Sequence, residues 1–545
     1  MSTAKHAVVS WVLLSIVLIW IFPMQVALKI TGVTIFSSII VLGVYKIYLR
    51  PFYFSPLRHL PEPKGGTLLN GHAKLVPNER SGMPLQEWIN EVPNDGLIRY
   101  RMMFNKEVVF ITSPKALSEV LVQKNYDFSK PYKLRQGLGR ILGIGLIIAE
   151  GEEHKILKKQ RKNLMPAFLH RHVKDLYPIF WEKSALLAVE LEQNIKRTGQ
   201  YSQVFDVADW LARTTLDILG AAGLGREFDT LHNPDNEIVR AYRGVFEQKP
   251  PRGVLGILLF LAKQQIINLL KIKQNDSIAA ATEVLTDVSR RLIKDKREEK
   301  ARDAKESIDR SARRDILSVA LDSGNFTDNM LENHLLTFLA AGHETTATSM
   351  TWAIYALCLY PQVQQRLREE VRANLPIGAT IGTNGISVTA ELVDSLPYLH
   401  AVCNEVFRVY PPAGLTRRVA AKDTSILGQH IPKGTAIAIS MRAVNISKEL
   451  WGDDAFVFDP ERWMKPSQAN SGGGVTNFSF MTFLHGPRSC IGQGFARGEF
   501  ACLLAAIVGT FELELEDKTS ELVIETGLTS RPKDGLRVRL RPILV

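Results

Sequence analysis

The pattern of hydrophobic and polar positions along the chain predicts a mostly helical protein behind an apolar N-terminus. Over most of the chain after residue 113, apolar residues recur at the three- and four-residue spacing of amphipathic helices. The segment 327–359 is the longest of these, and it is apolar on most faces, which indicates a buried helix. Helices are expected at 207–224, 276–300, 327–359, 362–373, 389–409 and 494–511, and strands at 96–101, 107–112 and within 417–442 and 521–543.

Two apolar segments before the folded body predict a membrane anchor. Residues 7–28 carry no charged side chain, and a helix of this length extends about 33 Å, enough to cross the core of a bilayer. After Lys29, residues 30–45 are again uncharged, but about 24 Å of helix is marginal for a second span. A cleavable signal peptide is the alternative. It fits less well because only Lys5 precedes a long apolar run.

Basic residues and prolines follow the apolar segments. Lys46, Arg50 and Arg58 predict that this flank, and the bulk of the chain behind it, faces the cytosol. Prolines at 51, 56, 61 and 63 predict a semi-rigid spacer without helical hydrogen bonds. The expected organisation is an anchor at 1–50, a proline-rich hinge at 51–66 and a folded domain at 67–545.

Composition narrows the class of protein. The chain has 545 residues, is 23% charged and contains four cysteines, which excludes a disordered chain and a disulfide-stapled scaffold. The formal net charge is +11, but no nucleic-acid-binding motif is present. The most basic stretch, 290–314, is interleaved with acidic residues and is typical of a solvated helix and loop. No nucleic-acid partner is therefore expected.

The strongest candidate for chemistry is the ten-residue segment Phe483-Leu-His-Gly-Pro-Arg-Ser-Cys-Ile-Gly. Cys490 lies in a loop just before a predicted helix, where the helix dipole and backbone N–H groups stabilise a thiolate. Gly486 and Gly492 allow the backbone to approach a flat ligand, and Arg488 can pair with a carboxylate. Together these residues suit a haem held by an axial sulfur and by its propionates. A cysteine alone in a loop is usually inert, so the prediction depends on the whole pattern.

A second candidate lies in the long buried helix, in the segment Ala341-Gly-His-Glu-Thr-Thr. A buried Glu344 is costly unless it is paired or functional. Gly342 and a bond from Thr345 to the carbonyl four residues earlier can open a local groove in the helix. An acid and a hydroxyl beside such a groove could carry protons into a dry cavity. The alternative is a helix kink with a satisfied polar pair.

A third pattern is interpreted as structural. Glu405 and Arg408 are three residues apart and share one helix face. Arg462, in Pro460-Glu-Arg-Trp, could complete an Arg–Glu–Arg cluster. Breaking a buried cluster of this kind is expensive, and its expected role is to fix the segment that presents the cysteine loop.

These motifs resemble the cytochrome P450 family of haem-thiolate monooxygenases. The chain has A-G-x-E-T-T, E-x-x-R, P-E-R-W and F-x-x-G-x-R-x-C-x-G in the order and spacing of that family, and the resemblance covers roughly residues 51–545. The segment 210–225 is similar to a buried mid-chain helix of the family. The anchor and the Pro-Lys-Gly-Gly hinge resemble microsomal members, and the chain as a whole resembles filamentous-fungal enzymes of secondary metabolism.

The resemblance implies a mainly α fold with a small β-rich subdomain around a buried b-type haem. Cys490 would be the proximal iron ligand, with Arg488 on a propionate and Phe483 and Gly486 in the cofactor loop. Glu344 and Thr345 would relay protons for oxygen activation. Electrons would come from NADPH through a cytochrome P450 reductase on the endoplasmic reticulum membrane, with cytochrome b5 as a second candidate partner.

Some residues depart from the family pattern. Leu484 occupies a place where many members have a small polar residue. The usual Trp-x-x-x-Arg segment that caps a propionate is missing, and His154 and Lys158 keep its spacing. Either of these two residues, or neither if the helix is a plain basic surface, could reach a propionate. Which of Arg417 and Arg418 faces the haem is open.

The substrate can be predicted only as a class. Apolar segments similar to pocket-lining regions of the family predict a lipophilic small molecule, such as a terpenoid, polyketide, alkaloid or fatty acid. The apolar stretch 253–262 is either a core helix or a surface that dips into membrane lipid. Two other functions compete. One is a haem-thiolate isomerase or dehydratase that needs neither O2 nor a reductase, and the other is a non-catalytic haem carrier. Glu344 and Thr345 argue against both, because neither needs a proton relay.

Overall fold

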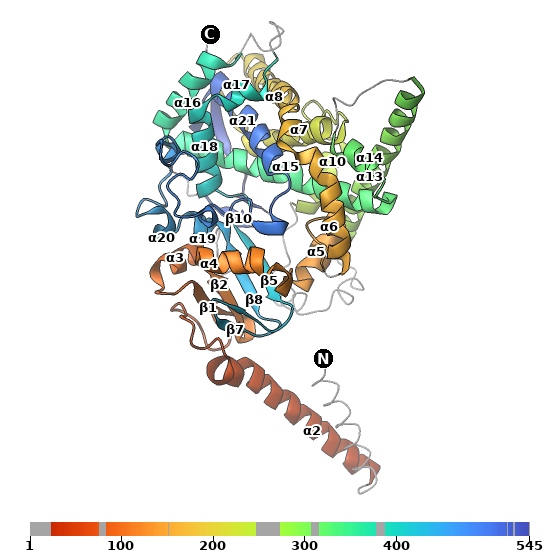
Figure 1. Cartoon of the computed structure of the whole chain (residues 1–545), viewed down its shortest axis with the longest axis vertical. Helices are drawn as coiled ribbons and strands as arrows, with labels where there is room; N and C mark the ends of the chain where they lie inside the picture. The colour runs from red at the N-terminus through yellow and green to blue at the C-terminus, as the bar shows by residue number, and fades with distance from the viewer. Residues whose placement is uncertain are drawn as a thin grey trace.

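The computed structural model describes residues 23–75, 83–150, 152–246, 273–306, 315–377, 387–519, 522–526 and 529–543. Most of the first predicted apolar segment, and the apolar stretch 253–262, lie outside the described residues. Figure 1 shows a mainly helical body, with the strands labelled β1, β2, β5, β7 and β8 at the side from which the N-terminal helix α2 extends. The expected fold class, mainly α with a small β-rich part, is confirmed in these terms.

The β-rich part is built around one five-stranded sheet in the order β1-β2-β8-β5-β3. The predicted first hairpin is present, with Leu97 opposite Ile111 in antiparallel register. The mid-chain strand β4 joins the C-terminal strands β12 and β9 in a three-stranded sheet, β4-β12-β9, and β6–β7 and β10–β11 form two hairpins. The strands are β1 Leu97–Met102, β2 Lys106–Ile111, β3 Phe128–Ser129, β4 Gln203–Asp206, β5 Leu415–Ala420, β6 Thr424–Ile426, β7 Gln429–Ile431, β8 Ala436–Ser440, β9 Phe511–Leu515, β10 Ile524–Thr526, β11 Ser530–Pro532 and β12 Arg537–Pro542.

Helices form the larger part of the body and surround α15, which crosses it in Figure 1. The main α-helices are α3 Met83–Glu91, α4 Pro114–Ser118, α5 Tyr132–Leu142, α6 Glu152–Leu164, α7 His170–Lys174, α8 Tyr177–Arg197, α9 Val207–Ile218, α10 Glu237–Phe246, α13 Lys273–Glu306, α14 Ile316–Asp322, α15 Asp328–Leu359, α16 Pro361–Asn374, α17 Ala390–Asp394, α18 Pro397–Val409, α19 Met441–Asn445, α20 Lys448–Trp451 and α21 Gln493–Thr510. Short 3-10 or π turns include η3 Glu119–Gln123, η6 Leu219–Leu224, η8 Pro460–Trp463 and η10 Gly486–Arg488.

The long helix α15 confirms the sequence prediction closely. Thr327 is its N-cap, and the hydroxyl of Thr327 accepts a hydrogen bond from the N–H of Met330. Pro361 begins the next helix and prevents α15 from continuing. Most of the residues of α15 are buried, as its apolar pattern predicts, and the helix packs against α9, α13 and α21. It is α-helical along its whole length, and no break occurs at Gly342.

One predicted helix is two helices. The pattern at 389–409 suggested a continuous helix, but the structure has α17 and α18, separated at Ser395 and Leu396. Pro397 is the first residue of α18, where its missing N–H costs nothing. The residue before a proline is kept out of helical backbone angles, and Leu396 is extended accordingly, with φ −96° and ψ 90°.

The anchor helix reaches further than the sequence suggested. A single helix long and apolar enough to cross a membrane runs from Met24 to Phe54 among the described residues. It comprises α2, Met24–Val44, and the π-helical turn η1, Tyr45–Phe54. Pro51 was expected to end helical structure and begin the hinge, but it lies inside η1. The helical backbone continues past this proline, and extended chain begins only at Ser55.

The end of the anchor helix is hydrogen-bonded to the β-rich part of the body. The side-chain amide of Asn105 donates to the carbonyl of Ile47 at 2.9 Å. The guanidinium of Arg99 donates to the carbonyl of Pro51 at 2.6 Å, and Pro51 is buried. These side chains satisfy carbonyl groups that helix geometry leaves without partners. The junction between anchor and body is therefore a fixed contact.

Candidate active site

Cys490 lies in a tight loop between η10 and α21. Its backbone N–H donates to the carbonyl of Phe483 at 2.9 Å, and the N–H of Ser489 donates to the carbonyl of Gly486 at 3.0 Å. The backbone N–H of Gly492, the N-cap of α21, donates to the sulfur. The loop thus holds the sulfur at a helix N-terminus, where the dipole and the N–H group favour a thiolate.

The sulfur is accessible, although protein surrounds it closely. Cys490 is exposed, while Cys403 and Cys502 are buried. Burial nevertheless raises the pKa of the Cys490 thiol, and the Gly492 N–H and the nearby Arg161 act in the opposite direction. Binding of a metal ion would release the proton of this thiol, because metals ligate the thiolate.

Two residues of the loop have left-handed backbone angles. Leu484 has φ 57°, which a leucine adopts only with strain. Gly486 has φ 81°, and a Cβ atom there would lie 2.3 Å from the carbonyl oxygen of Leu121 in η3. Glycine is required at 486 by this contact within the protein. Its role beside a flat cofactor stays a prediction.

Replacing Gly486 by alanine is expected to displace the cysteine loop, because the new methyl group collides with the backbone at Leu121. Gly428 is a matched control, since it has φ 80° but nothing within 4 Å of its Cβ position. Gly428→Ala should cost about 1 kcal/mol from backbone strain alone. Gly486→Ala should cost about 2–4 kcal/mol more and weaken haem retention, as measured by thermal unfolding and haem absorbance. Equal losses in the two variants would contradict this interpretation.

A group of buried cations surrounds Arg488. Its guanidinium donates to the carbonyl of Phe128 at 2.8 Å and pairs with Glu150 at 2.9 Å. Lys130 lies 4.0 Å from the same carboxylate. Burial lowers the pKa of Lys130 to about 7, with Glu150 opposing the shift and Arg418 and Arg488 adding to it. Burial likewise lowers the pKa of Arg418 to about 10. Three basic side chains thus share one acid, and this group is suited to an anionic ligand, which would also favour the charged form of Lys130.

The structure shows where the basic residues lie that the sequence left as alternative partners of the haem. Arg418 is buried in this group, whereas Arg417 is exposed. Lys158 is exposed on α6, and the side chain of His154 lies outside the described residues. Arg161, one turn beyond Lys158, acts electrostatically on Cys490. A propionate contact by His154 or Lys158 stays a prediction, and Arg161 was not predicted.

One face of α15 is accessible within its otherwise buried middle. Ala341 and Thr345 are partly exposed, while Glu344 and Thr346 are buried. The Thr345 hydroxyl donates to the carbonyl of Ala341 at 2.8 Å, as predicted. Thr346 contacts Glu499 of α21, the helix that begins three residues after the cysteine, at Gln493. The acid–hydroxyl pair and the cysteine loop therefore belong to neighbouring parts of one region.

Comparison with known proteins decides the family. The family model "Cytochrome P450" matches residues 61–538. The chain is 45% identical to the cytochrome P450 monooxygenase sphH of Aspergillus fumigatus over 95% of this chain and 93% of the relative. It is 42% identical to the cytochrome P450 monooxygenase FUM15 of Gibberella moniliformis, over 92% of this chain and 91% of the relative.

The chain belongs to the cytochrome P450 family. It is accordingly an oxidoreductase of the monooxygenase class, as the resemblance implied. The cytochrome P450 monooxygenase ALT8 of Alternaria alternata is a third fungal relative, 39% identical over 95% of both chains. The comparisons confirm the similarity to filamentous-fungal members of the family.

The residues of this P450 fit the family's haem. A single accessible thiol at a helix N-terminus suits an axial sulfur ligand. The group of basic side chains around Glu150 suits the two propionate groups of a haem, with Arg488, Arg418 and Lys130 as the candidate partners. Arg488 was singled out from sequence, Arg418 was one of two alternatives there, and Lys130 was not predicted. Lys130 is far from the cysteine motif along the chain, and no local pattern marks it.

The E-x-x-R motif of the P450 forms the predicted ionic cluster. Glu405 and Arg408 are both fully buried and pair at 2.7 Å, and Arg462 lies 3.8 Å from Glu405. The indole N–H of Trp463 donates to Glu405 at 2.9 Å. Arg408 also donates to three carbonyl groups, of Asn445, Ala455 and Val457. The carboxylate and the guanidinium are thereby fully satisfied, as buried charges require.

The same cluster is connected to the cysteine loop. The amide of Asn445 donates to the hydroxyl of Thr482 at 2.8 Å, and its oxygen accepts from the N–H of Met481 at 2.7 Å. The hydroxyl of Thr482 donates to the carbonyl of Phe407 at 2.6 Å. These bonds fix the entry to the loop against α18. They support the predicted role of the motif in holding the segment that presents Cys490.

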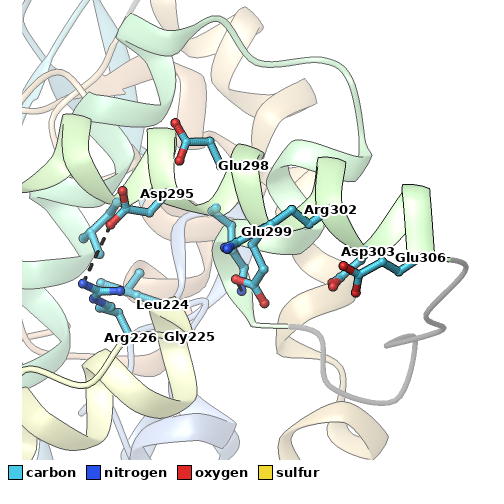
Figure 2. Close-up of a pocket in the computed structure, with 11 residues that line it drawn as sticks. Leu224, Gly225, Arg226, Asp295, Glu298, Glu299, Arg302, Asp303 and Glu306 are labelled. Carbon is cyan, nitrogen blue, oxygen red and sulfur yellow. Dashed lines mark hydrogen bonds and ion pairs between the residues drawn. The ribbon is translucent and has the colours of Figure 1, made fainter.

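A separate surface cleft of about 570 Å³ lies between the end of η6 and α13. Figure 2 shows that acidic and basic side chains line it, with Arg226 directed at Asp295. Charged walls do not suit a lipophilic substrate, so this cleft is not the site of oxidation. Its lining residues are Leu224, Gly225, Arg226, Leu292, Asp295, Lys296, Glu298, Glu299, Arg302, Asp303 and Glu306.

Proposed function

We propose that this P450 inserts one oxygen atom of O2 into a C–H or C=C bond of a lipophilic small molecule of fungal secondary metabolism, such as a terpenoid, polyketide or alkaloid. Electrons come from NADPH through a flavoprotein reductase, with cytochrome b5 as a second donor. The observation that carries the proposal is the accessible Cys490 sulfur, held by the Gly492 N–H beside a group of buried basic side chains.

The haem, when bound, supplies O2 activation and the oxidising power for the substrate. The residues of the chain hold the cofactor in place, neutralise its charged groups and transfer protons. Cys490 would hold the haem through its thiolate, and Arg488, Arg418 and Lys130 would neutralise its propionates. Glu344 is the acid of the relay beside α15's accessible face, and the Thr345 hydroxyl is the group that would pass a proton on. The apolar residues of the buried core keep bulk water out of this region.

We further propose that the enzyme works at the endoplasmic reticulum membrane with its catalytic domain, residues 67–545, in the cytosol. The apolar helix Met24–Phe54 supports an anchor. Lys46 and Arg50, near its end, support a cytosolic orientation of the body by the positive-inside rule. A lipophilic substrate would then reach the site from the same membrane that holds the reductase.

The test is spectroscopic and needs no known substrate. Full-length protein reconstituted with haem is reduced by NADPH and a P450 reductase under carbon monoxide, and a thiolate-type band is expected. Lipophilic metabolites are then screened by the spectral shift that follows displacement of water from iron. NADPH-dependent conversion of a binder identifies a monooxygenase. Turnover without NADPH would point instead to the isomerase or dehydratase alternative.

Thr345→Ala is expected to uncouple NADPH use from product formation. Removing the hydroxyl removes the proton donor on the accessible face of α15, while the fold loses only one bond within the helix. With a substrate found by the screen, product per NADPH should fall about tenfold or more, and hydrogen peroxide release should rise. Thr345→Ser keeps the hydroxyl and should retain most of the coupling. Unchanged coupling in the alanine variant would remove Thr345 from the relay.

A further inference from the structure

A C-terminal hairpin lies against the middle of α15. Strands β10 and β11 pair in antiparallel register, which places Glu525 directly across from Arg531. The indole N–H of Trp352 in α15 donates to the carbonyl of Ser530 at 2.7 Å and fixes the hairpin on the helix. The residues on either side of Ser530, Thr529 and Arg531, are therefore brought to α15.

Both of these residues contact the buried acid of the relay. The hydroxyl of Thr529 donates to Oε1 of Glu344 at 2.9 Å. A guanidinium nitrogen of Arg531 lies 3.6 Å from the same oxygen. The hydroxyl of Thr348, one turn further along α15, donates to Thr529 at 3.3 Å. The carboxylate of Glu344 is thus directed at the hairpin.

The contacts continue from the interior to the surface. Side-chain exposure rises from 12% for Glu344 to 31% for Arg531 and 38% for Glu525. A second guanidinium nitrogen of Arg531 lies 3.8 Å from the carboxylate of Glu525. A continuous line of polar groups therefore joins the relay acid to solvent. Water molecules can exchange protons along such a line, because its outer end is open to solvent.

The other titratable groups that face Glu344 do not reach solvent. His343, beside it on α15, and Tyr242 of α10 are both buried, and their rings are in edge contact at 4.5 Å. Burial lowers the pKa of His343, which Glu344 opposes. Burial raises the pKa of Tyr242, with a further contribution from Glu344. Both groups are therefore neutral near pH 7, and neither can bring a proton from outside.

We propose that the β10–β11 hairpin is the proton inlet of the site, where Thr529 and Arg531 hold the Glu344 carboxylate so that it takes its proton from solvent. This inference rests on the proposed function. A proton passes from solvent water to the carboxylate, and the neutral acid loses its attraction to Arg531 and can turn toward Thr345. Arg531 keeps its own protons throughout, because a guanidinium does not titrate in this range. It is a positioning residue.

The experiment follows protonation of Glu344 directly. Infrared spectra of the ferric, haem-loaded full chain are recorded across pH for the wild type and for Glu344→Gln. A carboxylic acid band that the wild type shows and Glu344→Gln lacks is assigned to Glu344. Arg531→Gln should move the appearance of this band to higher pH, because loss of the cation disfavours the charged carboxylate. Arg531→Lys keeps the charge and should stay near wild type. The matched control is Arg541→Gln, which removes an exposed ion pair with Glu512 on the neighbouring C-terminal sheet.

A kinetic readout separates an inlet from a purely structural contact. NADPH-driven O2 uptake with purified reductase is measured in H2O and D2O. In Arg531→Gln and Thr529→Val, uptake should slow about tenfold and its solvent isotope effect should rise, while Thr529→Ser and Arg541→Gln stay near wild type. An unmoved band and an unchanged isotope effect in Arg531→Gln would overturn the inlet. A wild-type protein without a thiolate-type carbon monoxide band would instead overturn the proposed function.

Discussion

Cys490→Ser is expected to abolish the thiolate-type carbon monoxide spectrum of the reconstituted protein and all NADPH-dependent oxidation. A serine hydroxyl fits the same loop, but it is a harder and far more basic ligand than a thiolate. The Gly492 N–H and Arg161, which favour a thiolate at this place, cannot make an alkoxide stable near pH 7. The loop should therefore keep its shape while the iron loses its sulfur ligand.

Cys358→Ser is the matched control. Cys358 is half-buried in α15, and burial raises the pKa of its thiol to about 12, so it is not a thiolate under working conditions. The substitution should leave the carbon monoxide spectrum unchanged. Circular dichroism should show equal helix content in the two variants. A thiolate-type band that survives Cys490→Ser would refute the assignment of the ligand.

Arg408→Met is expected to prevent stable folding. The substitution removes five hydrogen bonds, two to Glu405 and three to the carbonyls that Arg408 joins together. Glu405, itself fully buried, then keeps only the more distant Arg462 as a cation partner, at 3.8 Å. Breaking a buried ion pair from one side costs about 3–5 kcal/mol, a large part of the stability of an ordinary domain.

The measurement is the yield of soluble protein, its haem content and its thermal midpoint. Arg366→Met is the control, since Arg366 pairs with Glu461 at the surface and both side chains are about half exposed. Loss of such a pair should cost about 1 kcal/mol or less. Equal behaviour of the two variants would show that the buried cluster does not stabilise the fold. Retention of haem by Arg408→Met would separate the cluster from the cysteine loop.

The sequence predicted those parts of the site that are local along the chain. The cysteine loop, the Glu344–Thr345 pair and the Glu405–Arg408 pair each lie within one short segment, so spacing alone places their groups together. Lys130, Arg161 and Arg531 reach the region from distant elements. Their burial and neighbours depend on tertiary packing, which no local pattern encodes.

Helices and strands were likewise predicted where their pattern is local, and their ends were missed where they depend on other parts of the fold. Hydrophobic periodicity located α15 and the β1–β2 hairpin, because their patterns are long or end at clear turn signals. It missed the break before Pro397, since a single extended residue does not disturb the apolar repeat. It also ended the anchor helix too early at Pro51. The helix continues through Pro51, and the carbonyl of Pro51 accepts a hydrogen bond from Arg99 of the body, a contact that the local sequence does not encode.

The hydrogen bonds from Asn105 to Ile47 and from Arg99 to Pro51 fix the end of the apolar N-terminal helix to the β-rich part of the body. In the membrane-anchored arrangement proposed above, these contacts would hold the catalytic body at one height and tilt above the lipid. A truncated soluble form should for the same reason begin no later than residue 46. Cutting at the end of the helix would strip the β-rich part of two capping partners.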